Sequence, residues 1–276
     1  MAAFPPFDPN GTEEGDPRGP SIRDIPLRFI WPNLLTVLAI CAGLTGIRFA
    51  IEGDFNRAVI MVLLAAFLDG IDGRFARMLK ASSKFGEQMD SLADIVNFGV
   101  VPGMVLYLYV LDTAGPIGWI AVLLFAIACT LRLARFNVLL ENPGPEVWQG
   151  EYFVGVPAPA GAILVLLPVY AGLIGFEMSH SWALVSSAYT VAIGVLLVSR
   201  LPVWSGKALG SKVRRDAVVP IILGIALSVL FLAFYTWQTL VIVAVGYLTS
   251  LPFGARAYYK RLACQEEAAA SGKAAD

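Results

Sequence analysis

The sequence predicts an all-α integral membrane protein with about eight transmembrane helices and a polar site near one membrane face. Composition is the first observation that predicts this class. Hydrophobic residues make up 57% of the 276 residues, charged residues make up 15%, and the mean hydropathy is +0.70. Soluble domains carry about 25% charged residues. The formal net charge of −1 gives no reason to expect a nucleic-acid partner.

Long apolar runs are the second observation. Crossing roughly 30 Å of hydrocarbon takes about 20 apolar residues in a helix. Eight runs come close to this length, at 33–52, 57–79, 91–112, 116–137, 155–175, 182–199, 216–234 and 236–256. The joint between the last two runs, near Tyr235, is the weakest boundary. Six or seven spans are therefore the alternative to eight.

Both ends of the chain differ from this apolar middle. Residues 1–22 are rich in proline, glycine and acidic residues, and they lack the basic start and apolar core of a signal peptide. We expect a disordered tail there, and a second one at 262–276. The membrane domain is accordingly expected to occupy residues 23–261.

The positions of lysine and arginine predict the orientation, because cytoplasmic loops retain positive charge. With both termini in the cytoplasm, an eight-span arrangement leaves 18 of the 20 basic residues on the cytoplasmic side. Arg48 and Arg57 then lie on the far side. We therefore expect a multi-pass protein of the inner (cytoplasmic) membrane with both termini in the cytoplasm.

Polar residues interrupt the second apolar run in a regular pattern. Asp69, Asp72, Gly73, Ala76 and Arg77 are spaced i, i+3, i+4, i+7 and i+8, which places them on one face of a helix.

A second polar face follows, because Gly86, Asp90 and Asp94 are spaced i, i+4 and i+8. The stretch KASSK lies between the two faces and supplies a turn. Two helices joined by a short loop run antiparallel, so the faces are expected to converge near the cytoplasmic surface.

Four convergent carboxylates repel one another unless a cation neutralises them. Oxygen ligands suit a hard cation, Mg²⁺ or Mn²⁺, and four carboxylates suit two ions. Gly73 and Gly86 leave room for a ligand at the backbone, and Arg77 offers a fixed charge to a phosphate oxygen. This combination predicts a diphosphate site. A cation transporter is the alternative, but the carboxylates cluster at one membrane face, and the later runs carry no acidic residue in their interiors.

The eight motif residues spell D-x2-D-G-x2-A-R-x8-G-x3-D-x3-D, which resembles the signature of the CDP-alcohol phosphatidyltransferase family. The resemblance implies an enzyme that transfers the phosphatidyl group of CDP-diacylglycerol to an alcohol and releases CMP. It implies metal binding by four carboxylates, with Asp94 also acting as general base; the ligands are Asp69, Asp72, Asp90 and Asp94. For the CDP group it implies contacts from Gly73, Arg77 and Ser83, and Asp69, Ala76 and Gly86 are expected there as well. Membrane-embedded members of the family resemble homodimers, so a homodimer is expected.

Two residues that begin the first expected span are further candidates for binding the donor. Asn33 and Thr36 lie at the cytoplasmic level, where they are placed to hydrogen-bond a cytidine ring. For Asn33, capping of the helix after Pro32 is the alternative.

Four other stretches indicate which alcohol is the acceptor. WPNLLTVLAICAGL, DSLADIVNFGVVPG, LRLARFNV and GEYFVGVPAPAGA resemble the branch of the family that uses L-serine. Arg132, Arg135 and Asn137 end the fourth expected span, where an arginine fork suits the serine carboxylate. The alternatives are that both arginines are simple positive-inside anchors, or that the acceptor is glycerol 3-phosphate, inositol phosphate or choline.

Overall fold

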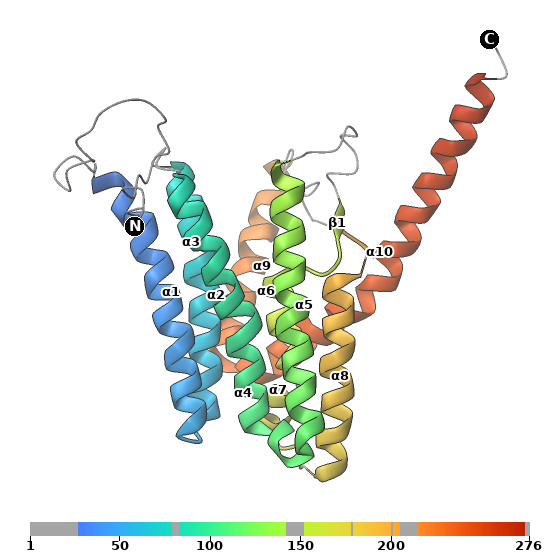
Figure 1. Cartoon of the computed structure of the whole chain (residues 1–276). Coiled ribbons are helices and arrows are strands. Elements are labelled where there is room, and N and C mark those ends of the chain that lie inside the picture. The colour runs from blue at the N-terminus through green and yellow to red at the C-terminus, as the bar shows by residue number, and fades with distance from the viewer. Residues whose placement is uncertain are drawn as a thin grey trace, which may run out of the picture. The chain divides into compact units, whose positions relative to one another are not determined.

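A computed structural model of the chain describes residues 27–78, 83–141, 152–177, 179–199, 201–204 and 215–273. Within these ranges the chain is helical apart from one pair of three-residue strands (Figure 1). The prediction of an all-α protein is thus right for the helices and missed this strand pair. The chain divides into two compact units, Met1–Tyr109 and Val110–Asp276, and each is described by itself.

The described residues of the first unit form five helical segments. They are α1 (Leu27–Ile51), α2 (Phe55–Met78), α3 (Lys84–Asp94), the π-helical η2 (Ile95–Val100) and α4 (Val101–Tyr109). A tight turn joins α1 to α2 through Gly53, whose φ of 80° suits glycine. Asp54 caps α2, because its Oδ1 accepts a hydrogen bond from the Arg57 N–H at 3.0 Å.

Small residues bring α1 and α2 together along their length (Figure 1). Ala39, Ala42, Ala58 and Ala65 are buried, and a Cβ added at Gly46 would lie 3.1 Å from the Ala58 carbonyl oxygen. Close backbone approach of this kind is typical of helix packing inside membranes. The helix formed by α3 and η2 packs against both α1 and α2, so three helices surround one interior.

The described residues of the second unit form the short 3₁₀ segment η3, five apolar α-helices, a strand pair and the long helix α10. Its elements are η3 (Leu111–Ala114), α5 (Pro116–Glu141), β1 (Tyr152–Val154), α6 (Ala158–Val165), α7 (Leu167–Ile174), α8 (His180–Val198), β2 (Pro202–Trp204), α9 (Arg215–Phe234) and α10 (Thr236–Lys273). Helices α5 and α8 pack against each other. The strands are antiparallel, with Phe153 opposite Val203.

Five described helices are long and apolar enough to cross a membrane. They include Trp31–Ile51, Phe85–Tyr109, Pro116–Leu139, His180–Val198 and Thr236–Gly254. Two shorter apolar helical stretches are Ala158–Ile174 and Val219–Phe234. Helix α2 has sufficient length but carries the charged motif in its last turns. The chain therefore has the architecture of a membrane protein, and the number of eight spans stays a prediction.

The C-terminal end of the chain differs from its expected form. Helix α10 continues to Lys273, so it extends into the segment 262–276 for which a disordered tail was expected. The N-terminal tail expected at 1–22 lies outside the described residues. So does most of the KASSK turn, since residues 79–82 are not described.

Candidate active site

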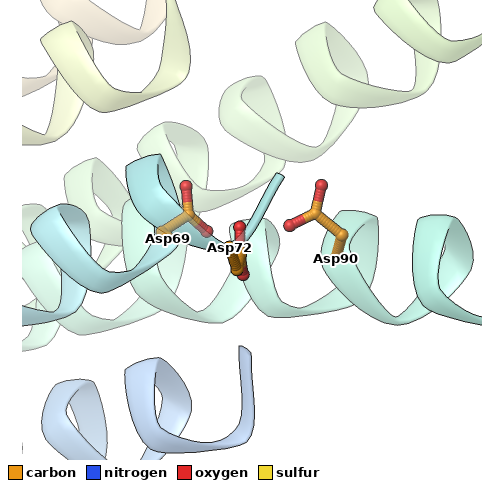
Figure 2. A group of neighbouring side chains, drawn as sticks. All are labelled: Asp69, Asp72 and Asp90. Atoms are coloured by element: carbon orange, nitrogen blue, oxygen red, sulfur yellow. The ribbon is translucent and has the colours of Figure 1, made fainter. Parts of the chain in front are cut away.

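Three carboxylates from two helices meet in the first unit. Asp69 and Asp72 lie on α2, and Asp90 lies on α3 (Figure 2). One carboxylate oxygen from each residue can be chosen so that all three oxygens lie within 4.8 Å of one another. Asp72 is buried with 3% of its surface exposed, while Asp69 and Asp90 are half-buried. The two polar faces thus converge as the spacing predicts.

Hydrogen bonds hold Asp72 in place. The Thr36 hydroxyl on α1 donates to Asp72 Oδ2 at 2.8 Å, and the Gly73 N–H donates to Asp72 Oδ1. Thr36 is itself buried, at 4% exposure. The structure adds a role for Thr36 that the sequence did not indicate, because its hydroxyl supports a carboxylate of the cluster. Contact of Thr36 with a cytidine ring stays a prediction.

Asp69 has an oxygen that needs a partner. Its Oδ1 is buried, and no described residue donates a hydrogen bond to it. The Asp94 carboxyl lies within hydrogen-bonding reach of Asp69, so Asp94 joins the same cluster from the α3 side. Burying a carboxylate oxygen that has no hydrogen-bond donor, beside three other carboxylates, lowers the stability of the fold unless a cation neutralises the charge.

These residues fit a hard divalent cation. The donors are all oxygens, which Mg²⁺ and Mn²⁺ prefer. Ligand oxygens at about 2.0–2.6 Å from an ion lie roughly 3–5 Å from each other, in line with the 4.8 Å limit found for Asp69, Asp72 and Asp90. A cation at this position would also serve the orphaned Asp69 Oδ1.

The start of α3 is fixed by Ser83. Its backbone is extended, with φ −134° and ψ 149°, and its Oγ accepts a hydrogen bond from the Gly86 N–H at 3.0 Å. The Glu87 N–H donates to the Ser83 carbonyl at 3.0 Å. Ser83 is therefore the N-cap of α3, and this capping role explains its extended backbone and its hydrogen bond to the Gly86 N–H.

The two motif glycines have different surroundings. A Cβ added at Gly73 would meet no atom of the described residues within 4 Å, so among those residues the backbone there faces open space. A Cβ at Gly86 would lie 3.0 Å from Asn33 Oδ1 and 3.2 Å from Ser83 Oγ. The absence of a side chain at Gly86 therefore lets α1 approach α3. We had expected this glycine to leave space for a ligand at the backbone. Asn33 is thereby located beside the first turn of α3.

Arg77 and Ala76 lie on the last turns of α2. The Arg77 side chain is exposed and lies close enough to Asp90 to attract its carboxylate electrostatically. An exposed cation beside the cluster is placed to meet an anionic ligand. Ala76 belongs to the same helix, and its side chain is outside the described set.

Arg132, Arg135 and Asn137 lie on α5, in the second unit. Arg132 Nε donates to the Val156 carbonyl at 2.8 Å, and its guanidinium lies 5.5 Å from the centre of the Phe136 ring. Both arginines line a cavity of about 40 Å³. The structure therefore adds a fixed backbone partner for Arg132, which the sequence had not indicated.

One buried polar residue near the cluster was missed by the sequence analysis. Asn97 is 1% exposed and lies in η2, three residues after Asp94. The sequence does contain a sign of this residue, because Asn97 is the one amide in the apolar stretch IVNFGVVPG. Polar side chains inside membrane helices are rare and often functional.

Comparison with known proteins agrees with this geometry. The family model of CDP-alcohol phosphatidyltransferase matches residues 29–251. The chain belongs to the CDP-alcohol phosphatidyltransferase family. The matched range includes all described helices that contribute to the carboxylate cluster.

Three relatives are informative about the branch of the family. CDP-diacylglycerol–serine O-phosphatidyltransferase of Mycobacterium leprae (strain TN) is 42% identical over 229 residues, which cover 81% of this chain and 74% of the relative. The enzyme of the same name from Helicobacter pylori (strain ATCC 700392 / 26695) is 37% identical over 63% of this chain and 71% of its own. Archaetidylserine synthase of Methanothermobacter thermautotrophicus is 31% identical, covering 62% of this chain and 67% of its own.

Proposed function

We propose that this protein is a phosphatidylserine synthase, which transfers the phosphatidyl group of CDP-diacylglycerol to the hydroxyl of L-serine and releases CMP. The cluster of Asp69, Asp72 and Asp90 with Asp94 beside it is the observation that carries the proposal. Family membership supports the chemistry, and the serine-specific names of the three relatives support the acceptor.

The four carboxylates are proposed to hold two divalent ions, Mg²⁺ or Mn²⁺. Such ions would neutralise charge on the diphosphate and on the departing CMP. Thr36 contributes by fixing Asp72, since its hydroxyl donates to that carboxylate at 2.8 Å. A fixed ligand keeps the oxygen atoms in the geometry that an octahedral ion requires.

The CDP group is proposed to lie over the open backbone at Gly73, because no described atom fills the space where a side chain would project. Arg77 would donate to a phosphate oxygen from the exposed side of α2. The other donor-side candidates are Asp69, Ala76, Ser83, Gly86, Asn33 and Thr36. Of these, Asn33 and Ser83 both have side-chain oxygens beside Gly86 at the start of α3.

Asp94 is proposed to act as general base. It would take the proton from the serine hydroxyl while that oxygen forms a bond to the lipid-side phosphorus. The bond from this phosphorus to the bridging oxygen breaks, and CMP departs with the electron pair. Asp94 is suited to this role because it lies on the same helical face as Asp90, one turn further along.

Arg132, Arg135 and Asn137 are proposed to recognise the serine carboxylate. Arg132 is held by the Val156 carbonyl and by the face of Phe136, and a restrained guanidinium loses less entropy when it binds an anion. Both arginines border the 40 Å³ cavity, which gives a small anionic group access to them.

In the cell we propose a homodimer in the inner (cytoplasmic) membrane, in contact with membrane lipids. Both termini and the active site would face the cytoplasm, where L-serine and CDP-diacylglycerol headgroups are accessible. The membrane domain would span residues 23–261. The distribution of basic residues supports the orientation.

An acceptor panel tests the proposal. Purified protein is supplied with CDP-diacylglycerol, Mn²⁺ or Mg²⁺, and one labelled acceptor at a time: L-serine, glycerol 3-phosphate, inositol phosphate or choline. We expect phosphatidylserine and CMP in equal amounts with serine. A preference for another alcohol would refute the serine assignment but keep the family chemistry. Cation flux in liposomes without any CMP release would favour the transporter alternative.

A further inference from the structure

Asn97 is the most deeply buried polar side chain near the carboxylate cluster. It is 1% exposed, and neither its Nδ2 nor its Oδ1 has a hydrogen-bond partner among the described residues. A buried amide without partners destabilises a protein, and an apolar side chain of similar size would avoid this penalty. The presence of asparagine here therefore points to a polar partner that the described side chains do not supply.

The backbone around Asn97 is unusual. Residues Ile95–Val100 form a π-helical segment that begins directly after Asp94. At its end, the Val101 N–H donates to the Val96 carbonyl, five residues earlier. Segments of this kind occur mostly as single turns within α-helices, and frequently at functional sites. Here the extra residue changes the direction in which side chains project just beyond Asp94.

Helix α1 makes room for the amide. A Cβ added at Gly43 would lie 2.5 Å from Asn97 Oδ1, a separation that real contacts do not allow. Gly43 lies seven residues after Thr36, on the same face of α1. One face of α1 therefore supports Asp72 through Thr36 and accommodates Asn97 two turns further along.

Orphaned polar atoms are present at two positions in this one interior. Asp69 Oδ1 on α2 is buried without a donor, and the Asn97 amide on η2 is buried without any partner among the described residues. Segment η2 packs against both α1 and α2. Buried waters typically make about three hydrogen bonds to otherwise unsatisfied groups of this kind. An amide offers both a donor and an acceptor, so it can orient such a water toward a carboxylate.

We propose that Asn97 is a positioning residue. Through a bridging water, its amide fixes the orientation of the Asp69 and Asp94 carboxylates. The proposal rests on the proposed function, because it assigns Asn97 a task only if these carboxylates do the chemistry. In this role Asn97 would contact neither substrate, because its side chain is buried. Its loss should lower turnover while the KM values for CDP-diacylglycerol and serine change little.

Two substitutions at Asn97 distinguish positioning from packing. Asn97→Leu fills the space but removes all hydrogen bonding, whereas Asn97→Ser leaves a small void and keeps a hydroxyl for the water. If Asn97 serves only packing, the leucine variant should be as active as the serine variant or more so, with raised thermal stability. Positioning predicts the reverse order, with a loss of about 10–100-fold in kcat for leucine, the usual effect of removing a group that orients metal ligands, and partial recovery for serine.

Gly43→Ala is a second test that leaves the Asn97 side chain in place. The added methyl should displace the amide, so kcat should fall in the same direction as for Asn97→Leu. Ser187→Ala is the matched control, because this buried hydroxyl in α8 already donates to the Ala183 carbonyl at 2.8 Å and lies outside the site. Its turnover should be unchanged.

Turnover of the wild-type protein with serine distinguishes a failure of the proposed function from a failure of the positioning role of Asn97. If wild-type protein releases no CMP with serine, the proposed function fails, and the variants are then ranked with whichever acceptor in the panel does release CMP. If wild-type protein makes phosphatidylserine while Asn97→Leu turns over at least as fast as Asn97→Ser, the positioning role is refuted.

Discussion

At the scale of single residues, Asp72 is the best-defined carboxylate of the site. It is almost fully buried and accepts hydrogen bonds from the Thr36 hydroxyl and the Gly73 N–H. A carboxylate held in this way presents its remaining lone pairs in fixed directions. Residues that fix a metal ligand influence metal affinity even though they do not touch the ion.

Thr36→Val is therefore expected to weaken metal activation. Valine has nearly the shape of threonine but cannot donate to Asp72, and a hydrogen bond to a charged group contributes about 1.5–3 kcal/mol. The concentration of Mn²⁺ needed for half-maximal CMP release should rise roughly 10- to 150-fold. Thr45→Val is the control on the same helix, since the Thr45 hydroxyl donates only to the Cys41 carbonyl. An equal effect in both variants would assign the loss to α1 as a whole.

Asp94→Asn separates base catalysis from binding. Asparagine keeps the size of the side chain but cannot accept the serine proton. General-base catalysis typically contributes 10²–10⁴-fold, so turnover at saturating serine should fall by about that factor. Apparent affinity for CDP-diacylglycerol should fall less than it does for Asp72→Asn or Asp90→Asn. Near-normal turnover of Asp94→Asn would show that another group is the base.

At the scale of elements, α2 and α3 carry the chemistry and α1 supports them. Spacing along the sequence predicted both polar faces, because a helix repeats every 3.6 residues. It could not predict which residues of α1 meet those faces. The sequence indicates Asn33 and Thr36 only as polar residues at the start of the first apolar run. Their actual neighbours, Asp72 and Gly86, depend on how α1 rotates against α2 and α3.

The same limit explains what the sequence missed. The IVNFGV stretch is apolar apart from Asn97, so it has the composition of an ordinary membrane helix. Its π-helical turn depends on packing with α1 and α2 and has no composition signal of its own. The β1–β2 pair was missed for a related reason: Tyr152–Val154 and Pro202–Trp204 are three residues each, too short to show an alternating pattern.

Two glycines of α2 provide a matched pair of variants. Among the described residues, a Cβ at Gly70 or at Gly73 meets no atom within 4 Å, and alanine favours a helix interior by roughly 0.5–1 kcal/mol over glycine. Both Gly70→Ala and Gly73→Ala should therefore be at least as thermally stable as the wild-type protein. Only Gly73→Ala should raise the KM for CDP-diacylglycerol, because the proposed donor lies over that position. Equal KM values in the two variants would remove Gly73 from the donor site.

At the scale of the whole molecule, orientation decides which compartment supplies the substrates. The distribution of basic residues predicts that Glu177 lies outside and Arg256 inside the cell. Both side chains are exposed in the structure. In a protein without its native cysteines, an impermeant thiol reagent added to intact cells should label Glu177→Cys and leave Arg256→Cys unlabelled until the cells are opened. The reverse pattern would place the carboxylates away from cytosolic serine.

Metal-dependent formation of phosphatidylserine is the most direct test of the central claim. Purified wild-type protein and Asp90→Asn are each given CDP-diacylglycerol and L-serine, with Mn²⁺ and again with excess chelator, and both CMP and the lipid product are quantified. We expect equal amounts of phosphatidylserine and CMP from the wild-type protein with Mn²⁺. We expect neither product with chelator, and neither from Asp90→Asn. Full CMP release by the wild-type protein in chelator, or by Asp90→Asn, would contradict a reaction centred on these carboxylates.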